Sequence, residues 1–81
     1  MNPFYTVVRQ FFKNGKETHS MEIKQDREEA ILRYFSIISA DLGDPDITYN
    51  AVYVIDSNGL MIEGRVFDRG FTAEEEAGNE A

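Results

Sequence analysis

The side chains in this sequence that are able to do chemistry are few and scattered. There is no cysteine, and His19 is the single histidine. A metal site needs further nitrogen or clustered oxygen ligands, and a nucleophilic serine needs a histidine base beside it. The glycines are isolated, so no phosphate-binding loop is present. We therefore expect no catalytic residue, no cofactor and no metal, and we interpret the protein as non-enzymatic.

Carboxylates form the other group of chemical interest. Their spacing does not match a calcium-binding loop, and helix termination and loop solvation account for most of them. The functional alternative is an acidic surface that imitates nucleic acid and binds a basic protein partner. The candidate residues for that surface are Asp41, Asp44, Asp46, Asp56, Glu74, Glu75 and Glu76.

The overall charge excludes some partners. The chain has 81 residues and a net charge of −7, from 15 acidic and 8 basic residues. Direct binding of nucleic acid is disfavoured, because phosphate contacts need a basic footprint. No apolar run approaches the roughly 20 residues of a membrane span, and no signal peptide is evident. We expect a cytoplasmic protein with no membrane partner.

One helix is predicted, between Asp26 and Gly43. Asp26 is a good N-cap, and Pro45 prevents continuation beyond Gly43. Apolar residues recur at helical spacing and define the predicted buried stripe, and Asp41 is expected nearer the solvent. The stripe comprises Ile31, Tyr34, Phe35, Ile38 and Leu42, widened by Ala30 and Ile37.

Segments rich in β-branched and aromatic residues flank the helix. Four strands are predicted, over Phe4–Phe12, about Glu17–Lys24, Ile47–Asp56 and Leu60–Phe67. Each pair of strands is separated by Asn-Gly, which favours a two-residue hairpin loop. Such loops place Val8 opposite Met21 and Thr6 opposite Ile23 in the first hairpin. In the second hairpin they place Ile55 opposite Ile62, Tyr53 opposite Gly64 and Ala51 opposite Val66.

The order ββαββ predicts an α+β fold, a four-stranded antiparallel sheet with one helix packed on one face. Strand order is left open. We assign residues 1–68 to this single domain and 69–81 to an acidic, disordered tail.

A single helix covers only one face of the sheet. The face with Ala51, Tyr53, Ile55, Ile62 and Val66 is the predicted core. The other face is expected to be uncovered, and an exposed apolar patch of that kind marks an interface with a second copy or another protein. Its residues are Tyr5, Val7, Arg9, Phe11, Val52, Val54, Met61, Arg65 and Phe67.

Two interpretations of the charged residues on that face remain. Arg9 and Arg65, with an aromatic such as Tyr5 or Phe67, would line an inter-subunit pocket for a nucleotide signal. The simpler interpretation is a row of cross-strand ion pairs with Glu22 and Glu63.

The layout resembles small ββαββ accessory proteins encoded by bacteriophages and mobile elements of Gram-positive gut bacteria. The resemblance spans residues 4–67 and lies in four features. These are the opening Phe-Tyr-Thr-Val-Val-Arg-Gln-Phe-Phe, the Asn-Gly-Lys hairpin, a helix beginning Asp-Arg-Glu-Glu-Ala, and a closing Val-Ile-Asp-Ser-Asn-Gly hairpin. Some such proteins inhibit host defence, by occupying the nucleic-acid site of a nuclease or by sequestering a nucleotide signal.

Three functions are therefore expected. The first is a phage-type inhibitor of a bacterial, CRISPR-like defence nuclease, acting through the acidic surface. The second is a module that sequesters a nucleotide signal between subunits. The third is a structural or assembly homo-oligomer.

Overall fold

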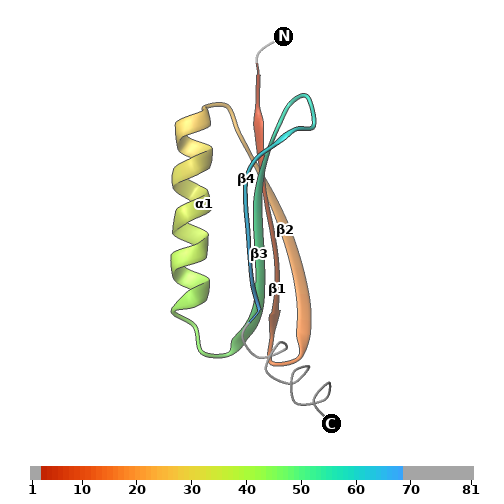
Figure 1. Ribbon diagram of the computed structural model, residues 1–81, viewed down its shortest axis with the longest axis vertical. Helices are drawn as coiled ribbons and strands as arrows, with labels where there is room; N and C mark the ends of the chain where they lie inside the picture. Colours follow the sequence, from red (N-terminus) through yellow and green to blue (C-terminus); the bar gives the residue numbers. More distant parts are fainter. Residues whose placement is uncertain (1–2, 69–81) are drawn as a thin grey trace.

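The computed structural model of the protein describes residues 3–68, which form a four-stranded sheet and one helix (Figure 1). The elements in chain order are β1 (Tyr5–Lys13), β2 (Lys16–Lys24), α1 (Arg27–Leu42), β3 (Ile47–Asp56) and β4 (Met61–Asp68). The predicted ββαββ order and α+β class are confirmed, with strand bounds that differ by at most one residue. The predicted disordered tail lies outside the described residues.

The first hairpin forms as the Asn-Gly pair predicts. Asn14 and Gly15 both have positive φ, 54° and 77°, as a type I′ loop requires. Val8 pairs with Met21 and Thr6 with Ile23, so the predicted register is confirmed over the whole hairpin.

The second hairpin has a longer loop than predicted. The backbone N–H of Asp56 donates to the carbonyl of Leu60 at 2.8 Å, and only Gly59 has positive φ in this loop. Ile55 consequently pairs with Met61, so the predicted Ile55–Ile62 pair is wrong. A bulge then restores the predicted register, in which Tyr53 pairs with Gly64 and Ala51 with Val66.

Helix α1 begins and ends where its caps predict. The Asp26 carboxylate accepts a hydrogen bond from the backbone N–H of Glu29 at 3.2 Å, which satisfies one of the open donors of the first turn. Gly43 is the C-cap, and its own N–H donates to the Ser39 carbonyl at 3.1 Å. The cap has φ −80°, a conformation open to any residue.

The strands are antiparallel throughout, in the order β2-β1-β3-β4. Strands β1 and β3 form the centre of the sheet, and α1 runs along one face (Figure 1). The other face is covered by no other element among the described residues; we call it the open face.

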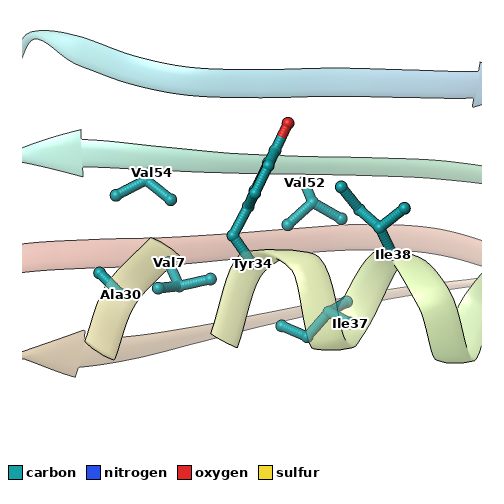
Figure 2. Close-up of a cluster of buried hydrophobic side chains, with 7 residues drawn as sticks. All are labelled: Val7, Ala30, Tyr34, Ile37, Ile38, Val52 and Val54. Carbon is teal, nitrogen blue, oxygen red and sulfur yellow. The ribbon is translucent and has the colours of Figure 1, made fainter. Parts of the chain in front are cut away.

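The core lies between α1 and the central strands. Figure 2 shows Tyr34 extending from α1 across β3, among valines of β1 and β3. Full burial of each such side chain contributes roughly 1.5–3 kcal/mol. The buried cluster consists of Val7, Ala30, Tyr34, Ile37, Ile38, Val52 and Val54.

Candidate binding surface

The helix covers the face that was expected to be uncovered. Val7, Val52 and Val54, three of the interface candidates, are buried beneath α1, and Tyr5 and Phe67 pack against the same cluster. The predicted choice of core face is therefore wrong. The face has a polar component, which argued against burial, and the helix provides partners for it.

Arg9 is the main polar residue on the covered face. Its Nε donates to Asp41 Oδ2 at 3.0 Å and its Nη2 to Asp41 Oδ1 at 2.5 Å. Asn50 Nδ2 donates to the same carboxylate at 2.5 Å. Asp41 is 2% exposed, so its predicted position near the solvent, and its role in an acidic surface, are wrong. This cluster anchors the last turn of α1 to β1 and β3.

A second ion pair joins α1 to the edge strand β2. Arg33 Nε lies 2.9 Å from Glu22 Oε2 and 3.1 Å from Glu22 Oε1. The hydrogen bond from the guanidinium lowers the pKa of the Glu22 carboxyl. Glu22 and Arg9 therefore do not form the predicted row of ion pairs between strands. Glu22 pairs with Arg33 of α1, and Arg9 pairs with Asp41 of α1.

The remaining candidates on the covered face do not form a common pocket. Arg9 and Arg65 both pair with Val52, from opposite sides, and Val52 is buried in the core between them. The Arg9 guanidinium lies 4.1 Å from the centroid of the Phe11 ring, a cation–π contact. Arg9 is thereby occupied by Asp41 and Phe11 within one chain.

Tyr34 places a polar hydroxyl group in the core beneath α1. Its hydroxyl is buried and has no hydrogen-bond partner of ordinary geometry among the described residues. Burial raises the pKa of the Tyr34 phenol, and the nearby Arg65 guanidinium opposes that rise. The hydroxyl therefore adds polarity to the core without a matching bond.

The open face is the apolar surface that the structure leaves exposed. Met21, Ile23, Met61 and Val66 point away from α1 and are 70%, 63%, 59% and 52% exposed. Of the interface candidates, only Met61 belongs to this face, because the bulge in β4 turns it there. Register also assigns to the open face the half-buried Val8, Tyr53 and Ile55 and the fully buried Ala51.

The open face is uneven as well as apolar. A shallow hollow near its β2 edge is lined by Val8, His19, Ser20 and Met21. On the β4 side, a Cβ placed on Gly64 would lie 2.7 Å from Met61 Sδ and 2.9 Å from the Tyr53 ring. These two side chains therefore lie over the glycine and fill the space that it leaves. At one end, the Phe12 and Tyr49 rings meet edge to face, with centroids 6.1 Å apart.

Charge is divided between the two faces by strand alternation. Arg9, Glu22, Lys24, Glu63 and Arg65 all belong to the α1 side. On the open face the charged strand residues are Glu17 and Asp68, which are level with each other at one end of the sheet. Among residues 3–68, the strand residues in the middle of the open face include no aspartate, glutamate, lysine or arginine.

Two acidic candidates, Asp44 and Asp56, have structural partners, and a third, Asp46, is exposed. Asp44 Oδ2 lies 2.8 Å from Lys13 Nζ, and Asp44 Oδ1 accepts from the backbone N–H of Asp46. Asp56 Oδ1 accepts from the N–H groups of Asn58 and Leu60, each at 2.9 Å. Glu74, Glu75 and Glu76 lie outside the described residues.

Among residues 3–68, no group of three or more acidic or histidine side chains is placed to hold a metal ion. His19 Nε2 lies 3.4 Å from Glu17 Oε2, which is a surface contact. No helix in the same range is long and apolar enough to cross a membrane.

The sequence pattern held one signal for the true orientation of α1. Residues 30, 34, 37, 38 and 41 follow helical spacing, and this stripe, with Asp41 included, is the buried one. Phe35, placed in the predicted stripe, is 50% exposed. A comparison of the chain with protein-family models, with curated proteins and with solved structures found no match.

Proposed function

We propose that this chain is a small, non-enzymatic protein-binding module whose binding surface is the open face of the sheet. The observation that carries the proposal is the exposure of Met21, Ile23, Met61 and Val66 on one uncharged surface. A contiguous exposed apolar surface of this kind is characteristic of a protein interface. Its aromatic and methionine content is also typical of interface centres.

The open face suits a protein better than a nucleic acid. Stacking of bases needs aromatic rings together with a basic groove. Among residues 3–68 the arginines and lysines of the strands belong to the α1 side of the sheet, not to the face that carries the rings of Tyr49 and Tyr53. An apolar protein surface is the complementary partner.

The two other expected functions rest in part on residues that have other partners. An inhibitor that imitates nucleic acid needs outward carboxylates, whereas Asp41 is buried and Asp44 is paired with Lys13. A pocket for a nucleotide signal needs an available Arg9, whose guanidinium is held by Asp41. The open face is therefore the better-supported surface, whether the biological outcome is inhibition of a defence protein or assembly.

Photo-cross-linking tests this proposal. A photoreactive phenylalanine analogue in place of Met21 samples the open face, and the same residue in place of the exposed Ser36 samples the outer side of α1. We expect protein adducts, with a second copy or with another protein of a bacterial lysate, from position 21 and few from position 36. Equal yields from both positions, or none from position 21, would contradict the proposal.

A further inference from the structure

We infer that the occupant of the open face is a second copy of this chain, packed face to face with its strands running opposite to those of the first. The inference rests on the proposed function, because it presumes that the open face is the binding surface. It specifies the partner and the direction of approach.

The charge distribution leaves one surface on which a second copy can pack. Two chains that each carry −7 repel one another, so they associate best through a surface where charge is sparse. The open face is that surface, since the strand charges other than Glu17 and Asp68 belong to the α1 side or to the hairpin ends.

The rows of side chains on the open face define how a second copy can lie on it. Two neighbouring rows cross the middle of the open face, one with Met21, Val8, Tyr53 and Gly64, the other with His19, Gln10, Ala51 and Val66. A two-fold axis across the strands lays each row on the other. Tyr53 then opposes Ala51 of the second copy, and Val66 opposes Gly64. Ala51 is already fully buried and Gly64 is covered by Met61 and Tyr53 of its own chain, so charge, not side-chain size, decides between the two possible axes.

The alternative two-fold axis, along the strands, is less favourable. This axis lays each row on the same row of the second copy and places the β2 edge of one sheet over the β4 edge of the other. Glu17 of one copy then lies over Asp68 of the other. Opposed strands instead place Glu17 over Ile23 of the second copy, at the other end of the sheet. Like charges buried face to face cost several kcal/mol, which selects the opposed arrangement.

The area is sufficient for a reversible dimer. Four strands of about eight residues cover a flat area of roughly 500 Å², which is a lower bound because accessible surface follows the protruding side chains. Stable interfaces bury roughly 600–1,000 Å² per partner. The flat estimate, a lower bound, lies just below this range, so we expect a weak dimer that dissociates on dilution.

Sedimentation equilibrium of the full chain, from low to high micromolar concentration, tests the occupant. We expect a monomer–dimer equilibrium whose dissociation constant rises by about tenfold or more in Met21→Glu and in Val66→Lys. Leu32→Glu, on the exposed outer side of α1, should leave it unchanged. Circular dichroism checks that each variant folds. Met21→Glu adds a negative charge and Val66→Lys a positive one, so an effect of net charge alone would change the dissociation constant in opposite directions in the two variants.

A distance measurement tests the direction. The chain has no cysteine, so Thr6→Cys gives a single spin label at one end of β1. Opposed strands place the two labels roughly 20 Å apart along the strand direction, whereas the alternative axis brings the labelled backbone sites to within roughly 10–12 Å. Short label distances would overturn the opposed arrangement.

The outcomes separate the two proposals. A monomer at every concentration, with position 21 cross-linked to a different protein, overturns the second copy and leaves the proposed function standing. A monomer with no adduct from position 21 overturns both. A dimer that Leu32→Glu dissociates and Met21→Glu does not would place the interface on α1 and also overturn both.

Discussion

The guanidinium of Arg9 and the carboxylate of Asp41 form a two-pronged ion pair, with N–O distances of 3.0 and 2.5 Å. It joins the central strand β1 to the last turn of α1. Because Arg9 belongs to one face of the sheet only, the pair helps to decide which face the helix covers. The open face, and with it the proposed binding surface, follows from that choice.

Asp41→Asn should destabilise the fold. The substitution keeps the shape of the side chain and removes the charge that compensates Arg9, whose side chain is only 27% exposed. We expect the free energy of unfolding to fall by about 3 kcal/mol, measured by urea denaturation at neutral pH. Asp46→Asn, in the exposed loop nearby, is the control and should change it by less than about 0.5 kcal/mol. Equal effects of the two substitutions would contradict a role for the buried pair.

Tyr34→Phe should not cost stability. The hydroxyl is buried without a hydrogen-bond partner of ordinary geometry among the described residues, so its removal relieves a desolvated group. We expect a free energy of unfolding equal to that of the natural chain or up to about 1 kcal/mol higher, by urea denaturation. A loss of stability above that size would show that the hydroxyl is bonded, with Arg65 the nearest candidate, and Arg65→Met would then remove the difference.

Acidification should remove the contribution of Glu22. Its pKa is lowered in the folded state by Arg33, so its stabilising effect is complete above the unfolded pKa near 4.5 and is lost as pH falls through the folded value. Glu22→Gln should therefore reduce stability at pH 7 and lose that effect near pH 3. A double-mutant cycle with Arg33→Gln isolates the pair. A coupling energy that does not change with pH would refute the assignment.

Replacement by alanine should affect Gly59, which has a positive φ, differently from Gly43. Gly59 has φ +86°, and nothing lies within 4 Å of an added Cβ, so Gly59→Ala should cost roughly 1–2 kcal/mol through backbone strain alone. Gly43 has φ −80°, and Gly43→Ala should be neutral or stabilising by about 0.5 kcal/mol. Thermal unfolding of both variants gives the comparison. A larger loss of stability for Gly43→Ala than for Gly59→Ala would contradict this explanation.

The helix and the strands could be predicted from the sequence because the residues at their ends favour caps and turns. Asp26 caps α1 as its side chain suggests, and Asn14 and Gly15 adopt the two positive φ angles that their types favour. At Asn58-Gly59 the same dipeptide served a longer loop. The difference lies in Asp56, whose carboxylate accepts from the N–H groups of Asn58 and Leu60 and stabilises the added residue.

The choice of sheet face could not be predicted from apolar content. Both faces alternate apolar residues, and the one with Arg9 and Asn50 appeared the less suitable core. Burial of a polar group is unfavourable only when it lacks a partner, and the partner, Asp41, lies in α1, 32 residues along the chain from Arg9. Whether such a pair forms depends on how the helix is rotated about its axis relative to the sheet. The alternation of residues along the strands carries no information about that rotation.

The central claim is that the open face is covered when this protein binds, and oxidation of its two open-face methionines tests it most directly. Met21 and Met61 are 70% and 59% exposed. Their rates of sulfoxide formation in dilute peroxide, followed by mass spectrometry against an added methionine peptide, should both fall as the protein concentration rises through the proposed monomer–dimer transition. Rates that stay equal to those of the dilute chain while the protein is dimeric would contradict the account.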